Sequence, residues 1–586
     1  MNFPHLRSFI EHLERHGELH RVRAEVDPYL EMTAIATRAV KEGQPAILFE
    51  RVKGSAFPVA MNVLASEKRI ELALGRHPQE VGRQLRRLID AAMPPRFGRL
   101  WRERSALGRV LAMKPKRIGK PPSQSTEIEP NLKSLPHPHC WPKDAAPFIT
   151  WGLVCTSDPE TQVGNIGVYR MQVFDEKRTG MHWQIQKGGG FHYHKAERMD
   201  KSLEVCVAIG VDPVLLLAAV APLPEGIDEI AFAGFLRGQR VPVAKGFELK
   251  KQMILAEAEF ILEGLVPPRE REPEGPFGDH FGHYSHPVPF PVFHAKVISH
   301  RPHPIYHAAV VGKPPQEDKF IGNAVQEMLL PMIKLIHPEI RDLWAYYETG
   351  FHSLAVASVE ERYGKEGVKA ALGLFGEGQM ALTKCLLLVD EDVHARDLAQ
   401  VLMAVRDYFD PSEDFLLLPG VPFDTLDFTS FTLNLGSKMV IDATRHAMAK
   451  HPHVAAPPDD LRSFDPRIRG SRCLENALLV VQVEREARSV LERLLKRPEL
   501  GSVKIIAAVS ADVHLDDREQ VLWGIFTRFD PARDVCFAES ELHGAWPVHR
   551  GRMGIDATWK PGYPDPIVVA PETERLVTQR WAEYWK

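Results

Sequence analysis

Asn165–Gly190 read NIGVYRMQVFDEKRTGMHWQIQKGGG, and further along the chain Glu274–Tyr284 read EGPFGDHFGHY. Both stretches lie in a region, from Phe148 to Phe293, where short β-branched and aromatic runs are separated by glycine and proline. Repeated short strands of this kind predict a β-barrel or sandwich-like domain in the middle of the chain. Within this domain we expect helices from about 214 to 219 and near 227–236.

The sequence on either side predicts further domains. Residues 1 to about 110 alternate helical patterns with short strands, which is typical of a small α/β domain. A Lys-, Pro- and Ser-rich linker from Met113 to Pro138 follows it. We therefore expect an α+β fold with an α/β domain over 1–130, a barrel-like domain over 131–320 and an α/β domain over 321–586.

The C-terminal region repeats itself. DVHARDLAQVLMAVRDYFDP at 392–411 matches DVHLDDREQVLWGIFTRFDP at 512–531, and each copy follows an apolar strand and precedes an IDAT sequence. This pattern predicts a duplicated βα unit, at about 380–445 and 500–560, whose copies extend one sheet. The aspartate before Val-His in each copy, Asp392 and Asp512, is expected to cap the following helix.

Composition limits the class of protein. The chain has 586 residues, of which 44% are hydrophobic and 26% charged, which is the balance of a globular protein. A net charge of −4 argues against nucleic-acid binding. Six cysteines without a CxxC pair predict reduced thiols, the N-terminus lacks the pattern of a signal peptide, and Asp212-Pro213 interrupts the most apolar window. These features predict a cytoplasmic protein.

Three charged residues could carry chemistry. Arg170 presents a guanidinium fork that matches a carboxylate, although a salt-bridged arginine on a barrel rim is an equal alternative. Glu274 and Asp279 lie in a tight Gly-Pro loop, where two neighbouring carboxylates can hold different pKa values and exchange a proton. An acidic surface loop is the alternative, but the flanking Phe277 and Phe281 favour burial.

Other residues could hold a phosphate or a metal. The run QKGGGFHYH offers Lys187 and backbone N–H groups to a phosphate. His192 and His194, two apart on an expected strand, could face one zinc ion, but no third ligand is evident nearby, which favours exposed histidines without a metal. Asn165 and Glu229 offer hard oxygen atoms of the kind that Mg²⁺ or Mn²⁺ prefers, although spacing alone does not pair them. A metal-dependent hydrolase or decarboxylase that uses the histidines around 182–194 and 280–283 is therefore a second hypothesis.

Several motifs in order resemble one protein family. Besides the two stretches quoted first, the chain contains CWPKDAAPFITWG (Cys140–Gly152), IAFAGFLRG (Ile230–Gly238), LTKCLLLVDEDVHARD and GSKMVIDAT. Together they resemble the UbiD family of reversible decarboxylases, which use prenylated flavin mononucleotide (prenylated FMN). The resemblance extends from about Leu132 to Thr444, and the second βα copy lies beyond the usual end of shorter members.

The resemblance implies a role for particular residues. Arg170, Glu274 and Asp279 fall where the family has its catalytic network, and Asn165 and Glu229 where it binds a divalent metal that bridges to the flavin phosphate. The central domain is implied to be a split β-barrel that binds the flavin. The positions that match the family's flavin-binding residues are Val168, Tyr169, Arg170, His182, Trp183, Gln184, Lys187, Gly188 and Lys384.

The resemblance also implies an activity and partners. The expected reaction is the reversible decarboxylation of an aromatic or α,β-unsaturated acid, such as a hydroxybenzoate- or naphthoate-type quinone precursor. The expected cofactors are prenylated FMN from a flavin prenyltransferase and Mn²⁺ or Mg²⁺, with K⁺ as a further ion. A dimer or hexamer is expected, with a C-terminal domain that closes over the site, and membrane association only through a lipophilic substrate. A non-catalytic assembly paralogue is a third hypothesis, against which the intact Arg170, Glu274 and Asp279 argue.

Overall fold

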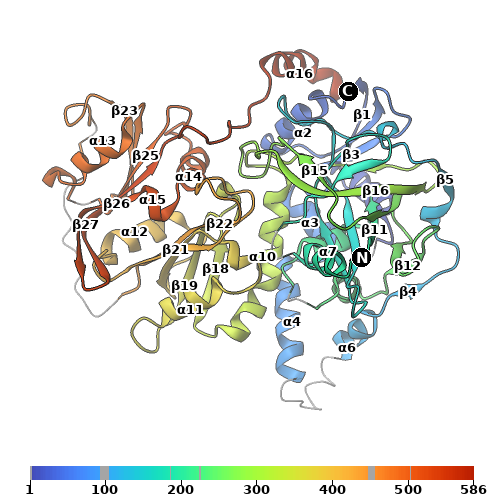
Figure 1. Ribbon diagram of the computed structural model, residues 1–586, viewed down its shortest axis with the longest axis horizontal. Helices are drawn as coiled ribbons and strands as arrows, with labels where there is room; N and C mark the ends of the chain where they lie inside the picture. Colours follow the sequence, from blue (N-terminus) through green and yellow to red (C-terminus); the bar gives the residue numbers. More distant parts are fainter. Residues whose placement is uncertain are drawn as a thin grey trace. The chain divides into compact units, whose positions relative to one another are not determined.

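The computed structural model describes residues 3–92, 104–184, 187–223, 226–445, 456–458, 460–501 and 503–586. These residues form two compact units, one of Met1–Pro331 with Asp565–Lys586 and the other of Met332–Pro564 (Figure 1). The boundary falls within helix α10 (Glu317–Ile336). Both units combine helices with sheets, which confirms the predicted α+β class; the division into three domains stays a prediction.

Unit 1 begins with a helix and a small sheet. The strand order is β1-β2-β3-β17, so a strand from far along the chain completes this N-terminal sheet. Its members are β1 (Leu19–Val26), β2 (Ala46–Val52), β3 (Val59–Met61) and β17 (Tyr306–His307). The accompanying helices are α1 (Leu6–Arg15), α2 (Glu31–Lys41), α3 (Glu67–Leu74), α4 (Pro78–Ala92) and α6 (Arg104–Leu111).

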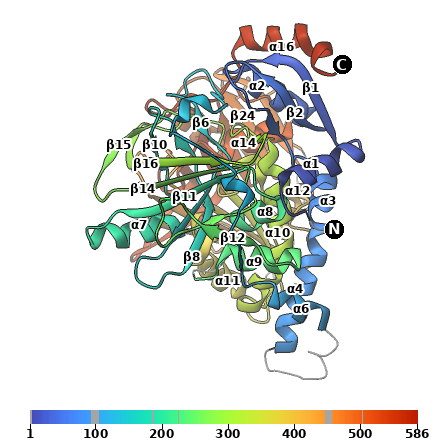
Figure 2. The ribbon, with the colours of Figure 1, turned by 90° about the vertical axis from the view of Figure 1, so that its right-hand side faces the viewer.

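The middle of unit 1 is an eight-stranded antiparallel sheet. Its main path is β10-β16-β14-β11-β7-β8, and β15 and β5 also pair with the long strand β16 (Figure 2). The bounds are β5 (Thr126–Ile128), β7 (Leu153–Ser157), β8 (Gly164–Val168), β10 (Arg178–Gly180), β11 (Leu203–Ile209), β14 (Phe260–Val266), β15 (Arg271–Glu274) and β16 (Val288–His300). The predicted short strands are therefore present, but the described strands form no closed barrel because β10 and β8 end the path without pairing with each other.

Smaller elements surround the central sheet. Two of its helices were expected from sequence: α8 (Pro213–Val220) is capped by Asp212, and α9 (Glu229–Arg237) by Asp228. Two short sheets lie beside them, formed by β13 (Met253–Leu255), β12 (Pro242–Lys245) and β4 (Lys116–Arg117), and by β6 (Phe148–Ile149) and β9 (Met171–Gln172). His192 and His194, which were expected on a strand, lie instead on helix α7 (Gly188–Arg198), which begins in the glycine-rich run.

The last part of the chain returns to unit 1. Helix α16 (Pro571–Tyr584) packs against α2 and β1, as Figure 1 shows. Tyr584 donates its hydroxyl to Glu31 of α2 at 2.6 Å, and Arg580 forms an ion pair with the same carboxylate at 2.5 Å. Ile567, Val577 and Tyr584 are buried in the core that also contains β1 and β2. The segment after Pro564 is thus part of the packing of unit 1.

Unit 2 contains two five-stranded sheets of the same topology. The first has the order β18-β19-β20-β22-β21 and the second β23-β24-β25-β27-β26, each with antiparallel outer pairs and parallel inner pairs. The first comprises β18 (Ile340–Ala345), β19 (Leu354–Val359), β20 (Cys385–Asp390), β21 (Phe415–Pro422) and β22 (Leu435–Asp442), with α11 (Glu366–Leu374) and α12 (Leu398–Tyr408). The second comprises β23 (Ile468–Leu474), β24 (Leu478–Val483), β25 (Ile505–Val509), β26 (Val535–His543) and β27 (Trp546–Ala557), with α13 (Ala487–Leu494), α14 (Arg518–Phe526) and α15 (Pro531–Asp534).

The repeat is larger than the sequence match indicated. Each copy builds a complete sheet of its own, so the expectation that two βα units extend one sheet was wrong. The additional strands β18, β19, β23 and β24 diverged too far in sequence to reveal the match. Apolar residues from the strands and helices of both repeats share one buried cluster, which includes Val356, Val405, Val480 and Trp523.

The helix caps of the repeat also differ from expectation. Asp392 and Asp512 cap no helix; instead they form ion pairs with Arg445 and Arg528. An aspartate five residues further along each motif is the cap, because Asp397 accepts N–H bonds at the start of α12 and Asp517 does so at α14. The helices begin later than the sequence pattern indicated.

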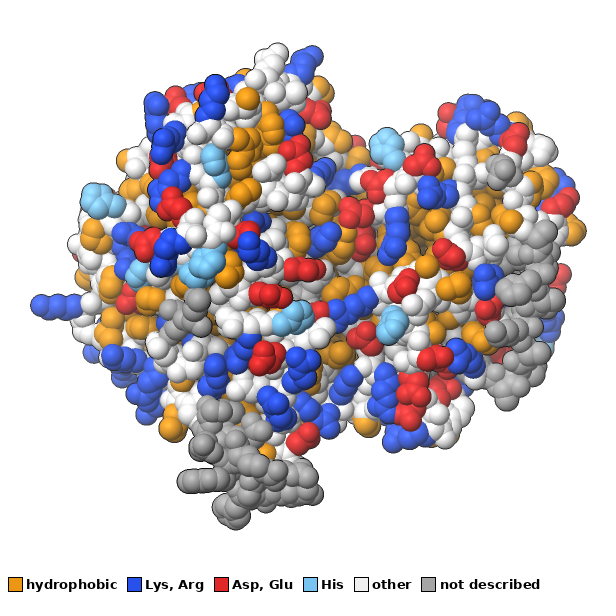
Figure 3. Space-filling model, turned by 180° about the vertical axis from the view of Figure 1, so that it is seen from behind, with side chains coloured by type: hydrophobic (Ala, Val, Ile, Leu, Met, Phe, Trp, Pro, Cys, Tyr) orange, Lys and Arg blue, Asp and Glu red, His pale blue; other side chains and the backbone are white. Residues whose placement is uncertain are grey.

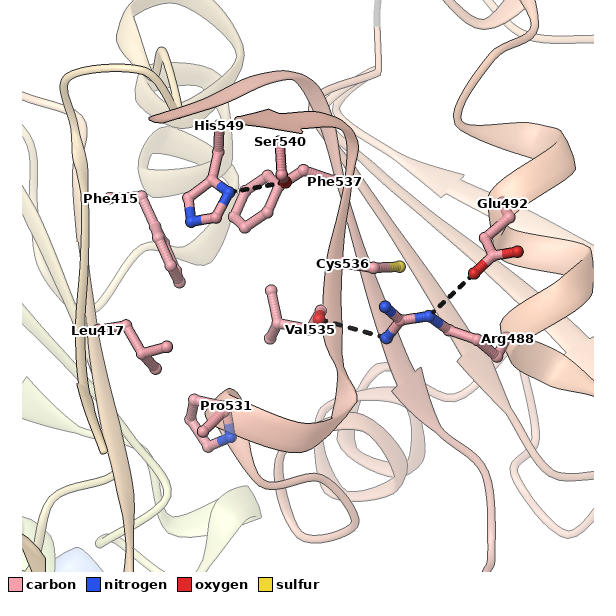
Figure 4. Close-up of a pocket in the computed structure, with 11 residues that line it drawn as sticks. Phe415, Leu417, Arg488, Glu492, Pro531, Val535, Cys536, Phe537, Ser540 and His549 are labelled. Carbon is pink, nitrogen blue, oxygen red and sulfur yellow. Dashed lines mark hydrogen bonds and ion pairs between the residues drawn. The ribbon is translucent and has the colours of Figure 1, made fainter. Parts of the chain in front are cut away.

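The two copies enclose a cavity between their edge strands β21 and β26. Its volume is about 230 Å³, and Figure 4 shows Phe415 and Leu417 of β21 across from Val535 and Phe537 of β26. Phe415 and Phe537 meet edge to face, with ring centres 4.9 Å apart. No residue singled out from sequence for catalysis or binding is among its described lining residues.

Charges of both signs are interspersed over the face shown in Figure 3, in keeping with the small net charge. Among the helices in the described ranges, none is both long enough and apolar enough to span a bilayer.

We predict that Asp397→Ala and Asp517→Ala each lower the free energy of unfolding by about 1 kcal/mol, because each removes a helix cap. Asp392→Ala is the matched control: its ion pair with Arg445 is half exposed, so the loss should be about 0.5 kcal/mol or less. Denaturant unfolding of the three variants measures the differences. An equal loss in all three would contradict the assignment of the caps.

Candidate active site

Arg170 and Glu274 form a buried, bidentate ion pair. Arg170 lies between β8 and β9, and Glu274 is the last residue of β15. Nε of Arg170 donates to Oε1 of Glu274 at 2.8 Å, and Nη2 donates to Oε2 at 2.9 Å. The Arg170 side chain is 8% exposed and that of Glu274 is fully buried. The structure therefore brings together two of the three residues that the sequence singled out for catalysis.

Further groups complete the surroundings of this pair. Nη2 of Arg170 also donates to the Ser285 hydroxyl at 2.9 Å, and the guanidinium lies 4.7 Å from the Phe277 ring centre. His182 places Nδ1 3.1 Å from Oε2 of Glu274. Within the described residues, the buried Nη1 of Arg170 has no hydrogen-bond partner. An arginine already held by one carboxylate thus keeps a donor for a second acceptor.

The ion pair determines the charge state of Glu274. Burial alone would raise the pKa of this carboxyl group, but attraction by Arg170 and His182 outweighs burial and lowers the pKa to about 2. Glu274 is therefore ionised at neutral pH in this structure. This is opposite to the raised pKa that a proton donor near pH 7 needs.

The loop from Gly275 to Asp279 follows Glu274 directly, and each of its N–H groups donates a hydrogen bond. The N–H groups of Gly275, Phe277 and Asp279 donate to Oε1 of Gln172, Oγ of Ser285 and the carbonyl of His283, respectively. Asp279 is 1% exposed and accepts the N–H of Phe281 at 2.9 Å. The loop is thus buried, as the flanking aromatic residues indicated, rather than an acidic surface loop.

Two neighbouring segments pack against this loop. On one side Oδ1 of Asp144 accepts the N–H of Gly278 at 2.8 Å. On the other side the returning chain bonds to the residues that follow the loop: Tyr284 donates its N–H to the Asp565 carbonyl, and Ile567 donates to that of Gly282. Sequence reasoning missed both supports and the Ser285 contact. Of these residues, only Asp144 could have been found from the sequence, since it lies in the Cys140–Gly152 motif.

The second cluster of the site joins Asn165 and Glu229. Asn165 lies on β8 and Glu229 begins α9, and Nδ2 of Asn165 donates to Oε1 of Glu229 at 3.0 Å. The N–H of Ile166 donates to Oε2 at 2.7 Å. Burial raises the pKa of Glu229 to about 7. Oδ1 of Asn165 is buried and has no hydrogen-bond partner in the described part of the chain. The structure therefore pairs the two residues that spacing alone could not.

The N-terminus of α7 lies beside this cluster. A Cβ atom on Gly188 would be 2.6 Å from the Asn165 amide carbon, and one on Gly189 would be 2.7 Å from Nε1 of Trp183. Only glycine allows this close approach of the helix start. The N-cap residue of α7 is Lys187, whose side chain makes no capping hydrogen bond. The N–H groups at a helix start favour an anion.

The remaining residues predicted to bind a flavin divide between the units. Val168, Tyr169, His182, Trp183 and Gln184 lie in unit 1 with Lys187 and Gly188. Tyr169 and Trp183 are buried, and burial raises the pKa of the Tyr169 hydroxyl. Lys384 lies in unit 2, where its Nζ donates to Oδ2 of Asp427 at 2.8 Å and both side chains are buried.

The histidines do not converge as a zinc site would require. His192 is buried on α7 and places Nδ1 2.9 Å from the Thr156 hydroxyl, while His182 bonds to Glu274. His192 and His194, two positions apart on a helix rather than a strand, lie on different helix faces. In the ranges that the structure describes, no group of three or more His, Cys, Asp or Glu is placed to hold a metal ion.

Comparison with known proteins adds a family match. Models for the N-terminal, Rift-related and C-terminal domains of UbiD, 3-octaprenyl-4-hydroxybenzoate carboxy-lyase, match residues 10–89, residues 116–314, and residues 319–443 with 469–557. The last model therefore covers parts of both repeats.

Individual relatives agree with this match. A Chlamydia pneumoniae protein, named as a subunit of 4-hydroxybenzoate decarboxylase, is 38% identical and aligns over 99% of this chain and 98% of its own. The closed form of Sedimentibacter hydroxybenzoicus vanillic acid decarboxylase has a TM-score of 0.68 at 27% identity, over 80% of this chain and 98% of that one. An evolved dimeric form of the UbiD-class enzyme HmfF from Pelotomaculum thermopropionicum, in complex with prFMN, has a TM-score of 0.62 at 26% identity, over 78% and 97%.

We predict that Glu274→Gln is less stable than the native chain by about 3 kcal/mol near pH 7. The reason is that the lowered pKa corresponds to a net stabilisation of the ionised carboxylate by about this free energy, which the neutral amide loses. A lowered carboxyl pKa stabilises fully above the unfolded value of 4.5, and this contribution is lost as the pH falls towards about 2. The difference between the two proteins should therefore shrink between about pH 5 and pH 2.

Glu272→Gln is the matched control, since Glu272 lies on the same strand but is partly exposed where it pairs with Arg178. Its loss should stay below about 1 kcal/mol. Denaturant unfolding at several pH values tests both variants. A Glu274→Gln difference that does not change with pH would show that the ion pair does not control the stability.

Proposed function

Since the chain belongs to the UbiD family of carboxy-lyases, we propose that it catalyses the reversible, non-oxidative decarboxylation of an aromatic or α,β-unsaturated carboxylic acid with prenylated FMN. The observation that carries this proposal is the buried Arg170–Glu274 pair, with Asp279 on the adjoining loop. These are the residue types and places expected for the family's catalytic network.

The residues around Asn165 fit a phosphorylated cofactor and a divalent metal. The uncapped start of α7 offers N–H groups to a phosphate, and the amide of Asn165 lies beside it. Asn165 Oδ1 and the Glu229 carboxylate are hard oxygen donors and would suit Mn²⁺ or Mg²⁺. Tyr169, His182 and Trp183 would line the flavin in the same unit, and Lys384 is a further residue that we propose for flavin binding.

Loss of CO₂ leaves carbanion character on an sp² carbon, and prenylated FMN, when bound, supplies the electron sink that side chains lack. Arg170 orients the substrate carboxylate through Nη1, the donor that Glu274 and Ser285 leave unused. Because the substrate carboxylate shares the guanidinium, it weakens the attraction that keeps the pKa of Glu274 low. Glu274 then takes up a proton more readily than in the free protein.

The proton that replaces CO₂ comes from one of the two buried carboxyl groups. Asp279 and Glu274 flank one short loop, so a proton can pass to the reacting carbon from either side chain. The side chains of Phe277 and Phe281, 1% and 2% exposed, keep bulk water away from the loop. This exclusion strengthens each electrostatic contact in the site.

The substrate we favour is a hydroxybenzoate- or naphthoate-type acid, such as a quinone precursor. The support is the name of the chlamydial relative and the vanillic acid decarboxylase among the similar structures. A flavin prenyltransferase would supply the cofactor in the cytoplasm, and the enzyme would work as a homo-oligomer. A metal-dependent hydrolase is less well supported, because His182 and His192 bond to separate partners.

The first test is an absorption spectrum and a mass of the bound cofactor, taken on protein co-expressed with a flavin prenyltransferase. We expect a bound prenylated flavin, CO₂ release from hydroxybenzoates and solvent-deuterium exchange at the carbon that loses CO₂. A colourless protein that stays empty after anaerobic reconstitution would overturn the proposal.

We further predict that Arg170→Ala and Glu274→Gln lower turnover by about 10²-fold or more, because each removes a group that acts on the reacting atoms. Arg178→Ala is the control: Arg178 is a partly exposed arginine paired with Asp175 on the same sheet, and its loss should leave turnover within about twofold. Circular dichroism and flavin content confirm that each variant is folded. Turnover of either site variant near that of Arg178→Ala would contradict the assigned roles.

A further inference from the structure

Asp144 is a buried carboxylate that the proposed reaction does not use. It lies in the segment Cys140–Gly152, outside any helix or strand, and its exposure is 6%. A carboxylate in such a place is costly unless hydrogen bonds compensate its burial. Its burial therefore requires hydrogen-bond partners.

Both oxygens of Asp144 accept backbone N–H groups from different parts of the chain. Oδ2 accepts from Trp141 at 2.9 Å, within its own turn, and Oδ1 accepts from Gly278 at 2.8 Å. Beside this bond the N–H of Ala145 donates to the carbonyl of Pro276 at 2.9 Å. Two neighbouring bonds thus fasten the turn at 141–145 to the loop that joins Glu274 to Asp279.

The packing around Gly278 allows no residue larger than glycine. A Cβ on Gly278 would lie 2.2 Å from Cδ1 of Trp141 and 2.9 Å from Cδ1 of Ile567. Trp141 is itself fixed, because its Nε1 donates to the Val311 carbonyl at 2.7 Å. Gly278 therefore lies against a rigid indole, with its N–H directed at Asp144.

The charge of Asp144 is linked to the ion pair. Burial raises its pKa to about 7, while the N–H groups of Gly278 and Trp141 and the attraction of Arg170 oppose that rise. The charged and titratable groups around it are Cys140 in its own turn, Arg170, and Tyr284, whose pKa burial raises to about 12. Asp144 is thus coupled both to the loop backbone and to Arg170.

We propose that Asp144 is a positioning residue, which holds the loop from Gly275 to Asp279 so that Glu274 and Asp279 keep their places around the substrate. It touches neither substrate nor cofactor and acts through Gly278. This inference rests on the proposed function, because the loop matters for catalysis only if the two carboxyl groups handle the proton.

The test compares Asp144→Ala with the native full-length chain. Alanine removes both acceptor oxygens, so the N–H groups of Trp141 and Gly278 both lose their bond to this side chain. We expect hydrogen exchange of the peptide that contains Gly278 to become about tenfold faster, as expected when a bond to a charged group is lost. We also expect kcat to fall by about tenfold to hundredfold with KM nearly constant and the flavin content unchanged.

Asp410→Ala, in unit 2, is the control, since Asp410 also accepts a backbone N–H, that of Ser412 at 2.9 Å. It should alter neither the exchange at Gly278 nor kcat. Unchanged exchange in folded Asp144→Ala, or an unchanged kcat, would overturn the proposal. If Asp144→Ala does not fold, hydrogen exchange of the native chain is the deciding measurement: an unprotected Gly278 amide excludes the role. Absence of CO₂ release in the native chain would refute the proposed function instead, and the exchange result would stand separately.

Discussion

The buried ion pair between Arg170 and Glu274 is the constraint on which the rest of unit 1 depends. These residues are 104 positions apart, and each would be strongly unfavourable in the interior without the other. The pair exists only because β15 and the segment between β8 and β9 are brought together by the strands around β16. Breaking a buried pair by removing one partner costs about 3–5 kcal/mol. The sheet therefore cannot rearrange without destabilising the charges that it encloses.

The sequence predicted the parts of the site that are local. Glu274 and Asp279 share one Gly-Pro loop, and the aromatic residues beside them correctly indicated burial. Contacts between distant segments left no such signal: nothing in the spacing places Asn165 against Glu229. His192 and His194 were expected on a strand, because three glycines before them disfavour a helix; here the glycines begin helix α7 and allow close approach to Asn165 and Trp183.

The two repeats of unit 2 show how one architecture can keep or lose a buried site. Strand pairing places Lys384 and Lys504 at equivalent positions, just before Cys385 and Ile505. In the first copy the loop between β21 and β22 carries Asp427, which pairs with Lys384. In the second copy β26 and β27 are joined directly after His543, and Lys504 donates to the Phe409 carbonyl at 3.0 Å instead. The two copies therefore share the strand and helix of the repeated motif, whereas the connection between their last two strands determines whether the buried lysine has an aspartate partner.

Unit 1 cannot be completed during translation until unit 2 has been synthesised, because the chain passes through unit 2 before it returns to unit 1. Residues 565–586 supply Ile567, Val577 and Tyr584 to the core of unit 1 and bond to the backbone at Gly282 and Tyr284. A ribosome produces them only after the whole of unit 2, although domains usually fold as they emerge. A nascent chain arrested within unit 2 would hold Arg170 and Glu274 but lack this closing segment. Completion of the packing around the loop from Gly275 to Asp279 therefore requires translation of both repeats, and a prematurely terminated product would lack the bonds at Gly282 and Tyr284.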